Sequence, residues 1–250
     1  MQQSGDSIPQ ERLAKNLQRV RARIDESASK VSRDSNSIVL VGVTKYASNE
    51  HSAALSRLGV LDLGESRVQD AERKIHAVAN NALRWHLIGH LQTNKAAKAV
   101  RLFHTIHSLD SARLALDLDK EARKFAAQTG AANFAVQCLI EINAAREANK
   151  FGLPPERSAL LELLKQTSAL KMLRVAGLMS MAPYADNPEP VSRPVFQHVR
   201  ELLHEANTAK VYPAPLSELS MGMTQDFQIA IEEGATIVRI GTALFGPRER

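Results

Sequence analysis

A lysine at the end of a β-branched run is the residue of this 250-residue chain that is best placed for covalent chemistry. Lys45 follows the apolar run from Ile38 to Thr44, which is typical of a buried strand. An amine at a strand end can be desolvated, so that its pKa falls and it attacks a carbonyl to form a Schiff base. The alternative is an ordinary solvated charge.

Small and hydroxyl side chains near the C-terminus could hold a phosphate. They occur in the segment from Ser220 to Thr224, which precedes a predicted helix, and in Gly241 and Thr242, which follow Arg239. Glycines let backbone amides approach an anion, and the hydroxyls of Ser220 and Thr242 add donors. An ordinary glycine turn, with Thr224 as a helix cap, is the alternative.

Apolar runs alternate with helical periods along the chain. Eight runs have the length and composition of buried strands. Such alternation predicts a parallel sheet, and eight units in about 250 residues is the size of a closed barrel. A doubly wound open sheet is the alternative, but no Gly-x-Gly-x-x-Gly segment follows the first run. The predicted strands are 38–44, 60–64, 84–90, 105–108, 134–143, 174–180, 216–220 and 237–241.

The first residues of the chain predict one further helix. Ser7 and Gln10 have the spacing of a capping box, and apolar residues then recur on one face. The expected fold class is therefore α/β, a single (β/α)8 TIM-type barrel with an additional N-terminal helix, and residues 1–250 form one domain. The apolar face of that helix consists of Leu13, Leu17, Val20 and Ile24.

Composition places the chain among globular proteins and excludes several functions. Apolar residues make up 44%, and no stretch approaches the roughly 18 uninterrupted apolar residues of a membrane span. With no apolar leader segment, we expect a cytoplasmic protein that does not bind membranes. The single cysteine, Cys138, excludes an internal disulfide and a multi-cysteine zinc site. The net charge is +5, but basic and acidic residues are mixed, so we expect no nucleic-acid binding.

In a barrel of this kind the loops after the strands converge at one end, where the functional groups gather. Arg239 alternates with Val238 and Ile240, so its side chain points into the barrel if theirs face the helices. The residues at the predicted strand ends are Lys45, Glu65, Ser66, His86, His90, Ser108, Asn143, Met179, Ser180, Ser220, Met221, Arg239, Gly241 and Thr242.

A lysine, a phosphate cup and an arginine at these positions together fit a pyridoxal phosphate barrel. Lys45 would form the internal aldimine, and Arg239 would face the pyridine nitrogen. Because a guanidinium stays protonated, it cannot hand that nitrogen a proton. The ring would then be a weaker electron sink than beside an aspartate.

Six ordered blocks of sequence carry a resemblance that spans the chain from about Ile38 to Arg248. They are 41–45 (VGVTK), 63–69 (LGESRVQ), 85–95 (WHLIGHLQTNK), 177–179 (GLM), 219–227 (LSMGMTQDF) and 238–246 (VRIGTALFG). In these blocks the chain closely resembles the pyridoxal phosphate homeostasis family (YggS/PROSC), whose fold matches the barrel domain of alanine racemase. The resemblance implies a protein that holds pyridoxal 5′-phosphate as a Lys45 aldimine. It would act in intracellular vitamin B6 and amino-acid homeostasis, without robust catalysis.

The resemblance also implies a site and partners. Pyridoxal phosphate is the expected ligand, amino acids and proteins that receive the cofactor are further partners, and we expect a monomer. No metal and no established catalytic residue belong to the site. Its cofactor-binding residues would be Lys45, Ser66, His86, Asn143, Met179, Ser220, Met221, Gly222, Arg239, Gly241 and Thr242.

Two segments depart from the family pattern. Ser66 and Arg67 stand where the family usually has Asn and Tyr, so a single hydroxyl replaces an amide with two donors and an acceptor. After the fifth predicted strand, only Asn143, Glu147 and Lys150 align with the family's Asn, Glu and Lys.

Two pairs of side chains have other interpretations. His86 and His90 would share one face of a strand, and no Asp, Glu or Cys at ligand spacing completes a zinc site with them. They would line the barrel mouth or fill its core with satisfied hydrogen bonds. Lys95 and Lys98 could bind an anion, but a solvated helix face is the simpler interpretation.

A racemase or another amino-acid enzyme of the alanine racemase barrel type is the alternative function. Two-base racemisation needs a second acid or base, and Tyr46 would point away from Lys45 on an extended backbone. Tyr184 and Tyr212 lie in loops flanked by proline, and the sequence has few residues after the eighth strand for a capping domain. An open cofactor favours binding and delivery over catalysis. A partner-regulating scaffold that senses the B6 pool fits the same site.

Overall fold

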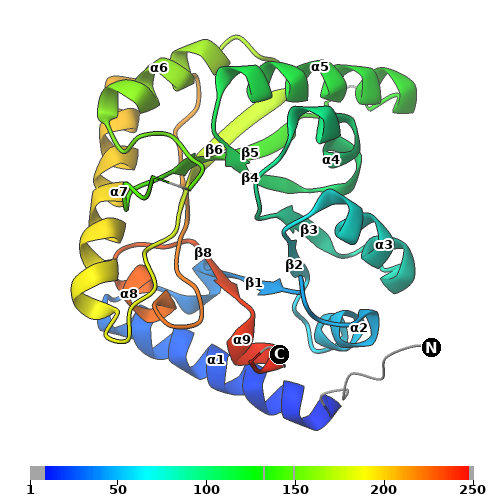
Figure 1. The fold of residues 1–250 in the computed structure, drawn as a ribbon, viewed down its shortest axis with the longest axis vertical. Helices are drawn as coiled ribbons and strands as arrows, with labels where there is room; N and C mark the ends of the chain where they lie inside the picture. Colours follow the sequence, from blue (N-terminus) through cyan, green and yellow to red (C-terminus); the bar gives the residue numbers. More distant parts are fainter. Residues whose placement is uncertain (1–8, 132, 149, 248–250) are drawn as a thin grey trace.

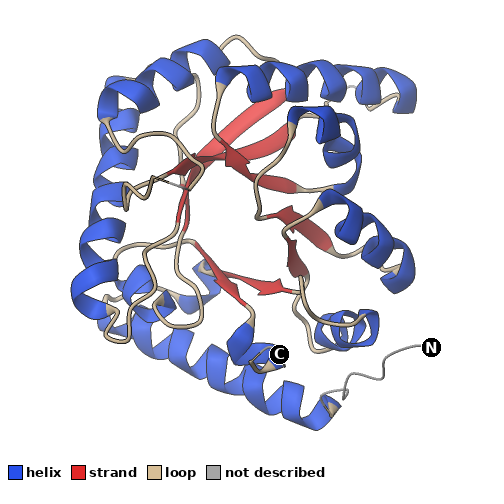
Figure 2. Cartoon of the chain, viewed as in Figure 1, coloured by secondary structure: helices blue, strands red, loops and turns tan. Residues whose placement is uncertain are grey.

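Eight short parallel strands close on themselves, because the first strand pairs with both the second and the eighth. The computed structural model describes residues 9–131, 133–148 and 150–247. Helices surround the ring of strands (Figures 1 and 2), so the predicted (β/α)8 TIM-type barrel is confirmed. The strands are β1 (Val39–Val43), β2 (Asp62–Glu65), β3 (Arg84–Leu87), β4 (Thr105–Leu109), β5 (Val136–Ile142), β6 (Leu173–Ser180), β7 (Glu218–Ser220) and β8 (Ile237–Ile240).

The helices follow the strands in the alternation that the sequence predicts. They are α1 (Gln10–Lys30), α2 (Asn49–Arg57), α3 (Val68–Val78), α4 (Ala96–Leu102), α5 (Ala112–Thr129), α6 (Arg157–Thr167), α7 (Glu189–Ala209), α8 (Phe227–Glu232) and α9 (Thr242–Phe245). Two single 3-10 turns, Ser35–Ser37 and Thr93–Lys95, also occur among the described residues. No helix among the described residues is long and apolar enough to cross a membrane.

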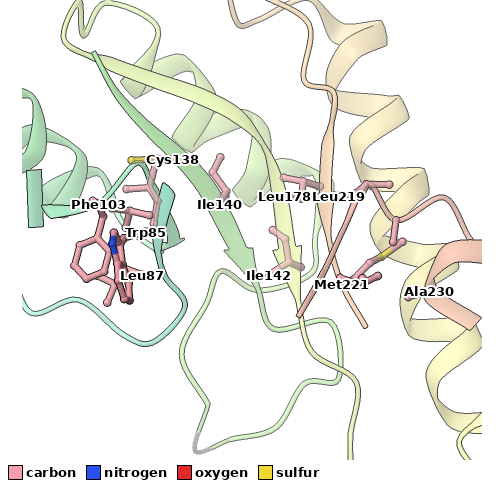
Figure 3. Packing of buried hydrophobic residues seen from close by; sticks show 14 of the residues in the cluster. Trp85, Leu87, Phe103, Cys138, Ile140, Ile142, Leu178, Leu219, Met221 and Ala230 are labelled. Atoms are coloured by element: carbon pink, nitrogen blue, oxygen red, sulfur yellow. The ribbon is translucent and has the colours of Figure 1, made fainter. Parts of the chain in front are cut away.

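The strands divide their side chains between two cores. Alternate residues of β8, Val238 and Ile240, face the large core between the strands and the helices. Figure 3 shows this layer, with Leu178 beside Leu219 and with Met221 directed toward Ala230 of α8. A second, smaller apolar cluster lies inside the barrel, because strands on opposite sides of the ring contribute to it. Its buried members are Val41, Leu139, Ala176, Met179 and Ile237.

The predicted N-terminal helix is present as α1, which packs against the two short C-terminal helices α8 and α9. Asn16 Nδ2 donates to the carbonyl of Leu244 at 2.9 Å, and the Arg23 guanidinium lies 4.5 Å from the centre of the Phe227 ring. Because α8 and α9 are only six and four residues long, α1 covers the part of the barrel that they leave open. Ser7 of the predicted capping box lies outside the described residues.

The third strand is shorter than predicted, because β3 ends at Leu87 and His90 lies in the loop that follows. This loop passes very close to the end of β2. A Cβ atom at Gly89 would lie 2.4 Å from the carbonyl oxygen of Ser66. Backbone this close to the neighbouring loop cannot continue the regular ladder, so the prediction that His86 and His90 share one strand face is wrong.

Candidate functional site

The residue with the strongest chemical prediction, Lys45, lies in a tight turn immediately after β1. Ala47 N donates to Thr44 O at 2.8 Å and closes this turn. The Lys45 side chain is exposed, and its Nζ lies 5.3 Å from the centre of the Tyr46 ring. The expected desolvation of Lys45 is therefore absent. The expectation that Tyr46 points away is also wrong, because the backbone turns here instead of remaining extended.

A second lysine lies buried behind the same strand end. Lys74 Nζ is 2.6 Å from Glu65 Oε1 and also donates to the carbonyl of Thr44. Thr44 Oγ1 donates to the same carboxylate oxygen at 2.6 Å, which fixes the residue that precedes Lys45. Because Lys74 is held by a buried carboxylate, Lys45 is the amine of this pair that a molecule at the barrel mouth can reach. Sequence reasoning missed Lys74, which occupies an ordinary helical position.

Arg239 points into the barrel, as its alternation with Val238 and Ile240 predicts. Its Nη1 donates to the carbonyl and the hydroxyl oxygen of Ser220, both at 2.6 Å, and its Nη2 donates to Ser180 O at 2.9 Å. Burial lowers the pKa of Arg239 to about 10, although Asp226 and Glu141 act in the opposite direction. The guanidinium is still charged at neutral pH, and three of its five N–H groups are used by the protein.

Ser220 lies inside the barrel and supports this arginine. Its side chain is fully buried, and its Oγ lies 2.9 Å from Nδ1 of His107. Because Arg239 can only donate, Ser220 Oγ accepts from it, and His107 Nδ1 is the second partner of this oxygen. Both partners of this hydroxyl are buried side chains inside the barrel, so the geometry does not support the expectation that it donates to a phosphate.

His86 is also an interior residue rather than a rim residue. Its Nδ1 lies 2.9 Å from His107 Nε2, and its Nε2 lies 2.9 Å from Asp62 Oδ1. Both ring nitrogens are thus engaged, which agrees with the core alternative. His90 is separate, with Nδ1 3.3 Å from Asp110 Oδ2. Within the described ranges, no cluster of three His, Cys, Asp or Glu side chains could hold a metal ion.

The rim of the barrel next to β1 is formed by the loops after β7 and β8. Thr224 Oγ1 accepts a hydrogen bond from the amide of Ala243 at 3.2 Å, which joins the two loops. The amides of Gly241 and Thr242 have no hydrogen-bond partner among the described residues. A Cβ atom at Gly241 would lie 3.4 Å from Val43, so these amides lie beside the end of β1. Thr224 was interpreted only as a helix cap, but its hydroxyl lies at this rim.

The other glycine of the predicted cup, Gly222, has a packing role. Its φ is +89°, and a Cβ atom there would lie 2.6 Å from Cβ of Ala230 and 2.8 Å from Cα of Phe227. Only glycine adopts this conformation easily and lets the loop pack on α8.

Three predicted site residues have side chains that pack or hydrogen-bond within the protein. Met221 is fully buried in the outer core (Figure 3), and its amide donates to Ile237 O at 3.1 Å. Met179 belongs to the small cluster inside the barrel. The Asn143 side chain closes its own loop, donating to Glu147 O at 2.9 Å and accepting from Glu147 N at 3.1 Å. Lys150 pairs with Glu147 at 2.7 Å.

Ser66 follows β2, the strand that pairs with β1. Ser66 is partly exposed and, with His90 and Lys95, lines a cavity of about 260 Å³. Lys98 forms an exposed ion pair with Glu72 at 2.7 Å, as expected for a solvated helix face. The carboxyl end of β1 therefore lies between Gly241 on the β8 side and Ser66 on the β2 side.

Glu141 is an interior carboxyl group that sequence reasoning missed. It lies two residues after Leu139 on β5, so its side chain has the same inward direction near the carboxyl end of the strand. Burial raises its pKa to about 7, and the nearby charge of Asp110 adds to this. An acidic residue within the apolar run 134–143 was the available signal.

Comparison with known proteins agrees with this architecture. The alanine racemase N-terminal domain model matches residues 8–249. The chain is 42% identical over 233 residues to the pyridoxal phosphate homeostasis protein of Aquifex aeolicus, covering 93% of this chain and 97% of that protein. The protein of the same description from Pseudomonas aeruginosa is 36% identical over 243 residues, with 95% and 96% covered.

Solved structures give the same result. PipY of Synechococcus elongatus, solved with pyridoxal phosphate bound, has a TM-score of 0.76 at 32% identity, covering 94% of this chain and 100% of that one. Alanine racemase of Clostridium difficile has a TM-score of 0.74 at 13% identity, covering 96% and 58%, which supports the fold alone. The resemblance in the six sequence blocks is thus confirmed, and the chain belongs to the pyridoxal phosphate homeostasis protein family, which has the alanine racemase N-terminal domain fold.

Proposed function

We propose that this protein binds pyridoxal 5′-phosphate at the carboxyl end of its barrel, through Lys45, and holds the cofactor for delivery within vitamin B6 and amino-acid homeostasis. The protein would do this in the cytoplasm as a monomer. When bound, the cofactor supplies an aldehyde that a lysine amine captures covalently. The observation that supports this proposal most strongly is the exposed Lys45 amine beside the loops after β7 and β8.

The donors on that side of the mouth have the chemistry of a phosphate site. The amides of Gly241 and Thr242, which have no hydrogen-bond partner in the described part of the chain, adjoin the hydroxyl of Thr224 next to the end of β1. Backbone amides and hydroxyls are the groups that bind a phosphate in such barrels. Thr224 therefore replaces Ser220 as the proposed hydroxyl donor.

Arg239 is the proposed partner of the ring nitrogen. Its two remaining N–H groups have no partner among the described residues, and its charge disfavours a proton on a nearby pyridine nitrogen. An unprotonated ring withdraws electrons weakly, which supports holding over turnover.

Weak amino-acid chemistry is the second candidate, and Glu141 is the observation that favours it. This carboxyl group lies inside the barrel near the carboxyl end of β5, and with a pKa of about 7 it could hold or release a proton at physiological pH. Tyr46, stacked under the Lys45 amine, is a further acid close to the site. These two groups make a direct test of turnover worthwhile.

The test is borohydride reduction of the protein loaded with pyridoxal phosphate, followed by peptide mapping. We expect the reduced cofactor on Lys45, and none in a Lys45→Ala variant. Lys98→Ala, which removes an exposed amine of a surface ion pair, is the matched control and should label normally. Labelling of Lys74 or Lys95 in the parent protein would contradict the assignment.

The same sample distinguishes a carrier from an enzyme. Loaded protein is incubated with single enantiomers of amino acids and followed for chiral conversion. Conversion no faster than with free cofactor supports the carrier role. Faster conversion that is lost in Glu141→Gln would establish the enzymatic alternative.

A further inference from the structure

A continuous row of hydrogen-bonded side chains crosses the inside of the barrel. Its members come from β2, β3, β4, β7 and β8, and all are buried. The separations are 2.9 Å from Asp62 to His86, 2.9 Å from His86 to His107, 2.9 Å from His107 to Ser220, and 2.6 Å from Ser220 to Arg239.

If both imidazoles are neutral, the chemistry of the two ends fixes the direction of every hydrogen bond in this row. Arg239 can only donate, so the Ser220 hydroxyl accepts from it and donates to Nδ1 of His107. A neutral imidazole that accepts at Nδ1 carries its hydrogen on Nε2, so His107 donates to Nδ1 of His86. His86 then donates from Nε2 to the carboxylate of Asp62.

The charges of the groups agree with this direction. Burial lowers the pKa of His107 well below its usual value, and the nearby charge of Arg239 acts in the same sense, so His107 is neutral. Burial opposes ionisation of Asp62, but hydrogen bonds from His86 and Arg84 hold its pKa down at about 2. A cation at one end and an anion at the other align the neutral dipoles between them.

The row connects the two ends of the barrel. Asp62 begins β2, and Arg84 holds it with Nε at 2.7 Å. Both residues, with Arg21 and Asp25, line a cavity of about 510 Å³ at the amino ends of the first three strands. Arg239 lies at the other end of the row, toward the proposed ligand.

We propose that His107 is a positioning residue for the cofactor. In its Nε2–H tautomer, His107 accepts the hydroxyl hydrogen of Ser220 at Nδ1. The lone pairs of the Ser220 oxygen then remain available to accept from Arg239, which fixes the orientation of the guanidinium. The inference rests on the proposed function, because Arg239 is the proposed partner of the pyridine ring. Without an acceptor at His107, the hydroxyl hydrogen would turn toward other oxygens and would compete with the guanidinium. Arg239 would then lose a fixed orientation.

The first experiment needs no cofactor and therefore separates this inference from the proposed function. Nitrogen-15 NMR of histidine side chains in the unloaded protein reports which ring nitrogen carries the hydrogen. We expect unprotonated Nδ1 and protonated Nε2 on both His86 and His107. Protonated Nδ1 on His107 would overturn the proposal, whether or not the protein binds pyridoxal phosphate.

The second experiment uses variants and the spectrum of the loaded protein. His107→Phe removes the acceptor and should weaken pyridoxal phosphate binding by about tenfold, the loss expected for a hydrogen bond to a charged group. It should also shift the absorption band. His107→Asn keeps an acceptor oxygen near Ser220 and should restore the parent band.

Ser108→Ala is the matched control, because Ser108 is the next residue on β4, is fully buried and has no partner for its hydroxyl among the described residues. It should leave affinity and spectrum unchanged. If His107→Phe lowers stability while the loaded protein keeps the parent affinity and spectrum, His107 is only a core residue and the proposal fails. If His107→Phe does not fold, the comparison of His107→Asn with the parent protein and the NMR assignment still decide.

Discussion

Lys74 Nζ lies 2.6 Å from Glu65 Oε1 in the interior, directly behind the strand end that carries Lys45. One lysine of this pair therefore serves as a buried counter-ion and the other is exposed at the mouth. The exposed amine is the one for which the sequence predicts a Schiff base, and the buried one neutralises Glu65. It also determines what a substitution at each position should do.

Replacing Lys74 with methionine should destabilise the protein by about 3–5 kcal/mol, because the Glu65 carboxylate would remain buried without a partner. Denaturant unfolding measures this. The double variant Lys74→Met with Glu65→Gln should recover part of the loss. Lys98→Met, which breaks an exposed pair with Glu72, should change the free energy of unfolding by less than about 1 kcal/mol. Equal effects at both lysines would contradict the buried pairing.

Stability should fall between pH 5 and pH 8 because of Glu141. Burial raises the pKa of this group to about 7 in the folded protein from 4.5. Its contribution is fully present below the unfolded pKa and is lost as pH rises through the folded value. The loss is about 3 kcal/mol at most. Glu141→Gln should flatten this part of the profile, as measured by denaturant unfolding at both pH values, and an unchanged slope would refute it.

Gly222→Ala should be strongly destabilising, by more than the roughly 1 kcal/mol of an ordinary left-handed glycine. Its φ is +89° and the added Cβ would lie 2.6 Å from that of Ala230. Gly130 is the control, since its φ is +71° but an added Cβ meets nothing within 4 Å. Thermal unfolding of the two variants measures the difference. Gly130→Ala introduces backbone strain alone, whereas Gly222→Ala introduces backbone strain and a steric overlap with Ala230. Similar losses would mean that the loop moves away from α8 easily.

Thr224→Val should weaken binding of pyridoxal phosphate by about tenfold while leaving pyridoxal nearly unaffected. Valine has the shape of threonine but cannot accept from the Ala243 amide or donate to a phosphate. Titration with both ligands measures the difference. Thr208→Val, an exposed hydroxyl on α7, is the control. A parallel loss for both ligands would show that Thr224 only holds the loop.

Local patterns were sufficient for the fold and for the direction of Arg239. Strand-like runs and helical periods each depend on a few neighbouring residues, and the inward direction of Arg239 follows from its alternation with Val238 and Ile240. The loop turn at Lys45 and Tyr46 was missed, because nothing in the short segment requires the chain to leave an extended conformation.

The interior row of hydrogen bonds could not be predicted in this way. Ser220 and His107 are 113 positions apart, and their contact depends on how the barrel closes. The sequence around His107 is typical of a buried strand, whereas the sequence around Ser220 is typical of an anion-binding loop. Histidine and serine can serve either in a core or in a binding site, and their neighbours in space decide between these roles. Residues far apart in the sequence become neighbours only in the folded barrel.

The packing of α1 on α8 and α9 has a consequence for how the chain folds. Asn16 binds the carbonyl of Leu244 across 228 positions, and β1 finds one of its two neighbours only when β8 has formed. During synthesis the apolar face of α1 and one edge of β1 therefore have no packing partner until α8, β8 and α9 have been made. Such high contact order slows folding and leaves nascent protein open to chaperones. Stopped-flow refolding should be slow, and the loops after β7 and β8 should gain protection last.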